Sequence, residues 1–190
     1  MVKEKIQFIL GGARSGKSQF AEDLAIKLFN NKDADGAQLV YVATAEVFDE
    51  EMRLRIDQHK ARRDSKWKLY EAPINLPSII QEVDSSNSII LVDCISVWIT
   101  NLLINGLNAH DYRKVLIQKL SMLKGQIILV SSETGLGIVP DNILSRQFRD
   151  ANGLTNQSIA RVADSVFFLV AGIPQKIKAS NHNSSGDDTL

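Results

Sequence analysis

Five short apolar runs recur along the 190-residue chain, and they constrain the fold more than any other feature of the sequence. They read IQFIL (6–10), QLVYVAT (38–44), SIILVDC (88–94), QIILVSS (126–132) and SVFFLVA (165–171). Apolar runs that do not alternate with polar residues are typical of strands buried on both faces of a sheet. The runs therefore predict a central sheet that is covered on both sides.

Amphipathic stretches separate these runs. Phe20, Leu24 and Leu28 recur every four residues after the first run, and a second stripe before the fourth run consists of Val115, Leu116, Leu120 and Leu123. Strand, helix and strand in repetition indicate a parallel sheet with right-handed crossovers and helices on both faces. We therefore predict an α/β fold with a mainly parallel central sheet, in which residues 1–178 form one domain and residues 179–190 a disordered polar tail.

The composition of the chain limits which binding partners and which cellular compartment we expect for the protein. With 22 basic and 22 acidic residues the chain has no net charge, so we expect no nucleic-acid partner. No run reaches the roughly 18 apolar residues of a membrane span. The single cysteine, Cys94, lies in an apolar run and has no partner for an internal disulfide. We expect a cytoplasmic protein without a membrane span.

The first apolar run leads directly into GGARSGKS at residues 11–18, which matches the P-loop pattern G-x-x-x-x-G-K-[ST]. Backbone N–H groups of such a loop, with the positive end of the helix that follows, bind phosphate oxygens. The predicted nucleotide-binding residues here are Gly11, Gly12, Ala13, Arg14, Ser15, Gly16, Lys17 and Ser18. We expect Lys17 to reach the outer phosphates and Ser18 to ligate Mg²⁺.

The third apolar run ends in Asp93, and a P-loop needs an acidic partner for its metal. In an open α/β sheet, ligands collect at the carboxyl ends of the strands. Asp93 could be a helix cap, but beside a P-loop it is the predicted second Mg²⁺ ligand with Ser18. The sequence thus predicts a P-loop NTPase (RecA-like) domain that acts as a nucleotide-dependent phosphotransferase or NTPase.

A basic segment, IDQHKARR at residues 56–63, contains one of the three histidines, His59. We predict a helix over residues 49–63, on which Met52, Ile56 and His59 share one stripe. His59 could be a solvated group, a core histidine, a phosphate-positioning group or a nucleophile. A nucleophilic histidine must be neutral, and nearby cations disfavour the imidazolium while stabilising charge on a triphosphate. Those cations are Arg55, Lys60, Arg62 and Arg63.

Five blocks of sequence go further than the P-loop. They are GGARSGKS, ATAEVFDEEMRLRIDQHKARR, the pattern W-x-x-x-E-x-P from Trp67 to Pro73, LVDCISVWITNLL, and ETGLGIVPDNILSRQFRDANGLTNQSIARVAD. Together they closely resemble the bifunctional adenosylcobinamide kinase/adenosylcobinamide-phosphate guanylyltransferase family of cobalamin biosynthesis. The resemblance covers residues 6–178.

The resemblance implies two reactions, with GTP and ATP as substrates and a divalent cation such as Mg²⁺. A nucleoside triphosphate phosphorylates the aminopropanol hydroxyl of adenosylcobinamide. GTP then loses pyrophosphate to an enzyme histidine, and the bound GMP passes to adenosylcobinamide phosphate to give adenosylcobinamide-GDP. The family's guanylylated histidine falls on His59 through the pattern Arg55, Ile56, x, x, His59. The resemblance further implies that the chain assembles as a homotrimer.

The resemblance also implies further nucleotide contacts. Glu71 would accept hydrogen bonds from N1–H and the 2-amino group of guanine, although it could also be a surface residue before a proline. The other residues carried over to the nucleotide site are Ala43, Thr44, Ala45, Lys60, Ala61, Arg62 and Arg63.

The chain departs from the family pattern at Leu69, Ser96, Ser132 and Thr134. These changes spare the P-loop, His59 and Asp93, so they bear on corrinoid binding or on the kinase reaction. Two alternatives remain from the sequence: a monofunctional P-loop small-molecule kinase, and a nucleotide-switched binding module.

Overall fold

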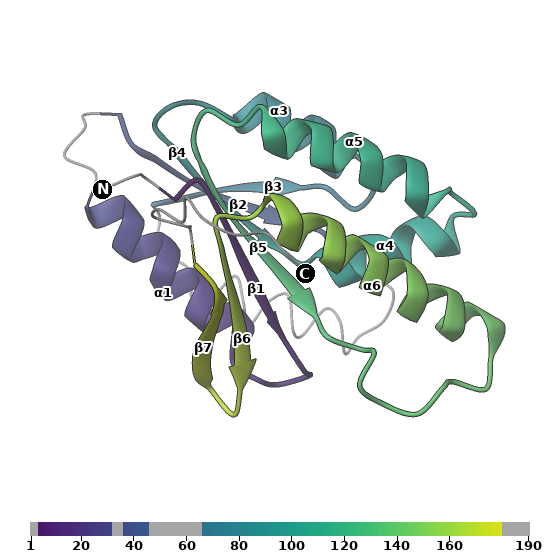
Figure 1. Ribbon diagram of the computed structural model, residues 1–190. Helices are drawn as coiled ribbons and strands as arrows, with labels where there is room; N and C mark the ends of the chain where they lie inside the picture. Colours follow the sequence, from purple (N-terminus) through teal and green to yellow (C-terminus); the bar gives the residue numbers. More distant parts are fainter. Residues whose placement is uncertain (1–3, 32–35, 46–65, 180–190) are drawn as a thin grey trace, which may run out of the picture.

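A computed structural model of the chain describes residues 4–31, 36–45 and 66–179. The strands of this described part form one seven-stranded sheet in the order β3-β2-β4-β5-β1-β6-β7 (Figure 1). Every neighbouring pair is parallel except β6 and β7. The strands are β1 (Ile6–Gly11), β2 (Gln38–Ala43), β3 (Trp67–Glu71), β4 (Ser88–Asp93), β5 (Gln126–Ser132), β6 (Ser165–Val170) and β7 (Ile173–Lys178).

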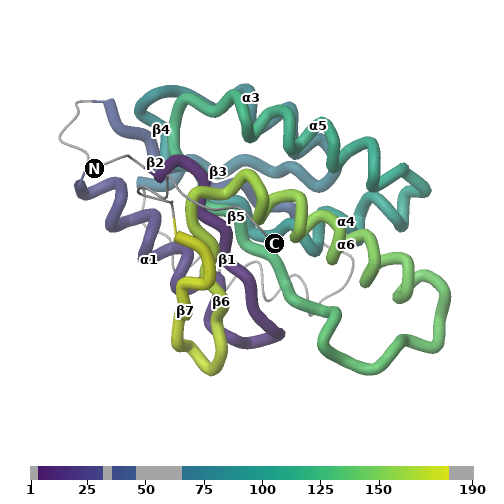
Figure 2. Tube along the Cα trace, in the orientation of Figure 1, coloured from purple at the N-terminus to yellow at the C-terminus, as the bar shows by residue number. Residues whose placement is uncertain are grey.

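Helices cover both faces of the sheet, and the predicted α/β class is confirmed. Helix α1 (Lys17–Asn30) packs on one face, and the tube in Figure 2 shows it apart from the other helices. The opposite face carries α3 (Leu76–Val83), α4 (Ile95–Ile104), α5 (Ala109–Ser121) and α6 (Ile143–Val162).

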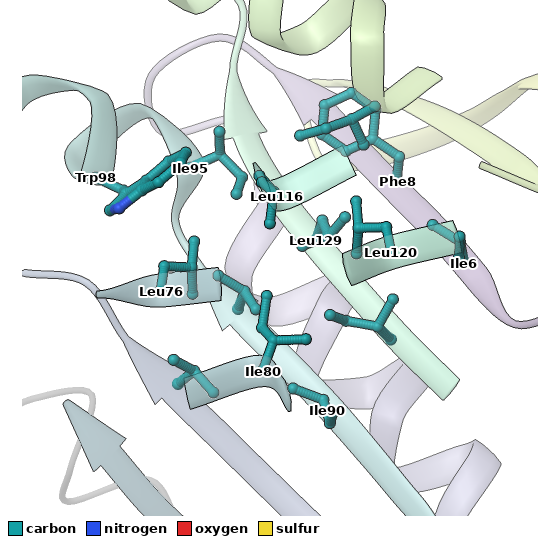
Figure 3. Packing of buried hydrophobic residues seen from close by; sticks show 14 of the residues in the cluster. Ile6, Phe8, Leu76, Ile80, Ile90, Ile95, Trp98, Leu116, Leu120 and Leu129 are labelled. Atoms are coloured by element: carbon teal, nitrogen blue, oxygen red, sulfur yellow. The ribbon is translucent and has the colours of Figure 1, made fainter. Parts of the chain in front are cut away.

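The core lies on both sides of the sheet because successive side chains of a strand point to opposite faces. In β1, Phe8 packs under the group of four helices and Ile9 packs against α1. Figure 3 shows the larger cluster, in which Leu116 of α5 and Ile80 of α3 lie over the strands. Each such buried side chain contributes about 1.5–3 kcal/mol. Trp98 is fully buried there and donates from Nε1 to the Ile74 carbonyl at 2.8 Å.

The five apolar runs are confirmed as β1, β2, β4, β5 and β6. The edge strands β3 and β7 were not predicted. The prediction for Val115 was wrong, because its side chain is 43% exposed while Leu116 and Leu120 face the core. Spacings of three and four residues keep a helix stripe on one face, and neighbours in sequence point about 100° apart.

Two predicted segments lie outside the described residues: the helix over residues 49–63, and the tail over residues 179–190 except for its first residue. Among the residues that are described, none of the helices is both long and apolar enough to cross a membrane.

Candidate functional site

The predicted phosphate loop lies between the last residue of β1 and the first turn of α1. Gly16 precedes the helix with φ 92°, a left-handed conformation that glycine adopts at little cost. A Cβ at Gly16 would lie 3.3 Å from the Cα of Gly172, in the turn between β6 and β7. The N–H of Gly172 also donates to the Ser15 carbonyl at 3.0 Å. The β6–β7 turn therefore supports the loop from the side, and glycine at position 16 leaves room for it.

Lys17 begins α1 and reaches back across the loop. Its Nζ donates to the Gly12 carbonyl at 2.7 Å. Desolvation lowers the pKa of this ammonium, and the negative charge of the nearby Asp93 partly opposes that shift. An ammonium that has lost part of its water and lies next to backbone N–H groups of a helix start is well placed to bind an anion.

Asp93 is the last residue of β4, and its carboxylate is fixed from β2. Tyr41 donates its hydroxyl to Oδ2 of Asp93 at 3.1 Å. The next residue, Cys94, follows a cis peptide bond, and the Thr44 hydroxyl bonds both its carbonyl (2.7 Å) and its N–H (2.8 Å). Burial, with the charge of Asp93, raises the pKa of the Cys94 thiol to about 12, so the thiol stays protonated near neutral pH.

The carboxyl ends of the parallel strands bring these groups to one edge of the sheet. Gly11 pairs with Ser132, and Ala43 pairs with both Asp93 and Glu71. Loop, acidic residue and the end of β2 therefore share the edge at which α/β proteins bind ligands.

Comparison with known proteins identifies the family. Residues 7–177 match the CobU family, described as cobinamide kinase / cobinamide phosphate guanyltransferase. The chain belongs to this family. It is 42% identical over 172 residues to the bifunctional adenosylcobalamin biosynthesis protein CobP of Pseudomonas aeruginosa, covering 90% of this chain and 95% of that protein. It is 37% identical over 185 residues to the bifunctional adenosylcobalamin biosynthesis protein CobU of Salmonella typhimurium, and 34% identical over the same length to CobU of Escherichia coli, covering 90% of this chain and 98% of each protein.

The structure places the remaining predicted nucleotide contacts in different settings. Glu71 ends β3 with an exposed side chain, and Ala43 and Ala45 are half-buried at the end of β2. Thr44 is fully buried, and its hydroxyl, N–H and carbonyl all bond within the protein. In this geometry Thr44 holds the β2 and β4 ends together, and its contact with a nucleotide stays a prediction.

Five of the predicted residues lie outside the described part of this CobU-family chain. They are His59, Lys60, Ala61, Arg62 and Arg63. Strand β2 ends at Ala43, at the edge of the sheet that holds the phosphate loop, and the described residues stop at Ala45, before the segment that contains them.

Sequence reasoning missed Asn101, a fully buried amide in the middle of α4. Its Nδ2 donates to the Thr44 carbonyl at 2.8 Å and to the Pro73 carbonyl at 3.1 Å. One side chain thus fixes the segments that follow β2 and β3. The signal in the sequence is an amide within the mostly apolar stretch WITNLL, where a buried polar group needs partners.

A second missed group is a buried polar network under the end of β5. Ser132 donates its N–H to Oγ of Ser96 at 2.7 Å, and its carbonyl accepts from Asn152 at 2.8 Å and from Asn156 at 3.2 Å. Ser131 completes the network with a 2.7 Å bond to Oδ1 of Asn156 and a 3.0 Å contact with Ser96.

This network includes three of the four departures from the family pattern. Ser96 and Ser132 are members of it, and Thr134 accepts from Asn152 at 3.4 Å. The fourth departure, Leu69, is a 43% exposed residue of the edge strand β3. The departures at Ser96, Ser132 and Thr134 are thus accommodated by hydrogen bonds.

The donor set predicted for a metal consists of the Ser18 hydroxyl and the Asp93 carboxylate. Mg²⁺ prefers hard oxygen ligands and is usually held by one or two protein groups together with substrate phosphates and water. The two residues fit that requirement. Within the described ranges, no group of three or more His, Cys, Asp or Glu side chains is suited to a metal ion.

Proposed function

We propose that this protein phosphorylates the aminopropanol hydroxyl of adenosylcobinamide and then transfers GMP from GTP to the product, giving adenosylcobinamide-GDP. The observation that carries the proposal is the phosphate loop beside Asp93 in a chain that matches the cobinamide kinase / cobinamide phosphate guanyltransferase family over residues 7–177. The similar proteins are named as bifunctional proteins of adenosylcobalamin biosynthesis, which agrees with two reactions. Neither alternative, a monofunctional kinase or a nucleotide switch, is favoured by any of these observations.

In the kinase reaction the protein acts mainly by positioning and by neutralising charge. The N–H groups of the loop and the start of α1 bind the phosphates of ATP or GTP. Lys17 exchanges its bond to the Gly12 carbonyl for a contact with the outer phosphates, whose negative charge offsets the cost of desolvating its ammonium. Ser18 and Asp93 would hold Mg²⁺, which supplies charge neutralisation at the phosphate oxygens.

In the guanylyltransferase reaction we propose His59 as the nucleophile. Its neutral ring nitrogen attacks the α-phosphorus of GTP, a P–N bond forms, the bond to the bridging oxygen breaks, and pyrophosphate leaves. A phosphate oxygen of adenosylcobinamide phosphate then attacks the same phosphorus and releases His59. Support comes from the family pattern at Arg55, Ile56 and His59 and from the cations that follow His59.

Base selection is assigned to Glu71. A carboxylate can accept from both N1–H and the 2-amino group of guanine, and adenine has no such pair of donors. The exposed position of Glu71 at the end of β3, paired with Ala43, is compatible with this contact. We further propose that the enzyme is a cytoplasmic homotrimer with no nucleic-acid partner.

Labelled GTP tests the central step. The protein is incubated with GTP labelled at the α-phosphate, denatured and treated with acid, because a phosphoramidate is stable to denaturation but labile to acid. We expect acid-labile label on the wild type and none on His59→Asn, with phosphorylation of adenosylcobinamide better preserved in the variant.

The matched control is His110→Asn, because His110 is an exposed histidine at the start of α5 that contacts Arg113. It should retain the label. Label on His59→Asn at the wild-type rate would show that another residue is the nucleophile. A wild type that carries no label but phosphorylates adenosylcobinamide would instead indicate a monofunctional kinase.

A further inference from the structure

Glu133 directly follows β5, the strand that lies between the phosphate-loop strand β1 and the Asp93 strand β4. Its N–H donates to the Gly11 carbonyl at 3.0 Å, so its backbone is bonded to the first residue of the phosphate loop. The residue is half-buried. Glu133 therefore starts at the sheet edge that holds the phosphate loop, directly after the strand that adjoins β1.

The side chain of Glu133 is ordered by its own loop. Oε1 accepts from the N–H of Gly135 at 2.5 Å. A Cβ at Gly135 would lie 2.9 Å from that oxygen, so glycine there permits the close approach. This hydrogen bond uses Oε1 of Glu133. The second carboxylate oxygen, Oε2, can also accept a proton.

The buried network under β5 gives this arrangement rigid support. Both backbone groups of Ser132, the residue before Glu133, are bonded to buried side chains: the N–H to Ser96 and the carbonyl to Asn152 and Asn156. A buried polar network is costly unless its members are paired, and when paired it fixes geometry. Such support is what a group that must meet a reacting atom requires.

Other carboxylates at this edge are less suited to contact an acceptor hydroxyl. In the described part of the chain, the parallel strands present carboxylates at Glu71, Asp93 and Glu133. Glu71 ends β3, which is separated from β1 by three strands. Asp93 accepts from Tyr41 and is the proposed metal ligand. Glu133 alone of the three adjoins the phosphate-loop strand.

We propose that Glu133 is the general base of the kinase reaction, an assignment that rests on the kinase half of the proposed function. The Glu133 carboxylate takes the proton of the aminopropanol hydroxyl as that oxygen bonds to the γ-phosphorus. The bond from the γ-phosphorus to the β–γ bridging oxygen breaks, and the nucleoside diphosphate leaves. The proton on Glu133 then passes to water. Attack on the α-phosphate of GTP by a neutral histidine needs no such base.

The test compares Glu133→Gln with the wild type in three measurements: nucleotide affinity, phosphorylation of adenosylcobinamide, and guanylylation of supplied adenosylcobinamide phosphate. The amide keeps the shape and the oxygen that accepts from Gly135. We expect kinase kcat to fall about 10²- to 10⁴-fold. Nucleotide affinity and guanylylation should stay within about threefold of the wild type, because neither requires proton removal by this group.

The control is Asp141→Asn, which removes one exposed carboxylate from the same connection between β5 and α6. Its kinase activity should match the wild type. A Glu133→Gln kinase within about threefold of the wild type, or a parallel fall in guanylylation, would overturn the assignment. A wild type without kinase activity overturns the kinase half of the proposed function and this inference with it, whereas an active wild type beside an active variant overturns Glu133 alone.

Discussion

At the scale of one residue, Lys17 illustrates the electrostatics of the predicted phosphate loop. Its ammonium is partly desolvated, its pKa is lowered, and it is bonded to the Gly12 carbonyl. Lys17→Ala would remove the charge-assisted contact proposed with the outer phosphates, and a contact of this kind contributes about 1.5–3 kcal/mol. We therefore expect triphosphate affinity to fall roughly 10- to 150-fold, as measured by calorimetry.

The control for this variant is Lys27→Ala, since Lys27 is an exposed lysine in the last turn of the same helix. Its affinity for triphosphate should equal that of the wild type. Equal affinity in Lys17→Ala as well would remove the basis for assigning residues 11–18 to phosphate binding.

The site residues that could be predicted from the sequence share one property, namely that each is recognised from its immediate neighbours in the chain. The phosphate loop is a contiguous motif between a strand and a helix, and Asp93 ends an apolar run. Asn101 and Asn152 were missed because their partners come from distant parts of the chain: Thr44 and Pro73 for Asn101, and Ser132 for Asn152. A polar residue in an apolar helix signals burial with partners, but only the fold determines which partners these are.

At the scale of elements, the central strands could be predicted and the edge strands could not. Strands β1, β2, β4 and β5 are buried on both faces and therefore have nearly continuous apolar sequences. The edge strands have mostly exposed side chains, and β7 also contains Pro174, which has no N–H to donate. A continuous apolar sequence therefore identifies a strand that is buried on both faces. It does not identify an edge strand, whose side chains are mostly exposed.

Asn101 of helix α4 joins the segments that follow strands β2 and β3, and this role can be tested. Asn101→Ala leaves the Thr44 and Pro73 carbonyls without the amide that pairs them. An unpaired buried polar group costs about 1–3 kcal/mol. Because Oδ1 of Asn101 is itself buried without a partner among the described residues, its removal offsets part of this cost, and the free energy of unfolding should fall by about 1–3 kcal/mol for the two carbonyls together. Urea denaturation measures it. Gln118→Ala, which removes an exposed amide from α5, should change stability by less than about 0.5 kcal/mol. Equal effects of the two substitutions would contradict the role given to Asn101.

At the scale of the whole molecule, the connection between β5 and α6 stands out from the layers of the fold (Figure 1). It exposes several large apolar side chains, with Leu136 at 85% and Ile138 at 96% exposure, followed by Val139 and by Ile143 at the start of α6. Soluble proteins rarely leave a large group of apolar side chains in water unless it contacts a partner. The proposed homotrimer offers such a partner, because each copy of the chain presents the same surface.

The proposed assembly makes a prediction about mass. Light scattering should give the wild type three times the 21.1 kDa mass of the chain. The double substitution Leu136→Ser and Ile138→Ser removes apolar contact area without touching the buried core, so it should shift the mass toward that of a single chain while thermal unfolding stays cooperative. Met122→Ser is the control, because Met122 is another exposed apolar residue, at 56%, and it follows α5 at the opposite end of the strands from the phosphate loop. A wild type with the mass of one chain would refute the trimer. A double variant that keeps the wild-type mass would place the interface elsewhere on the surface.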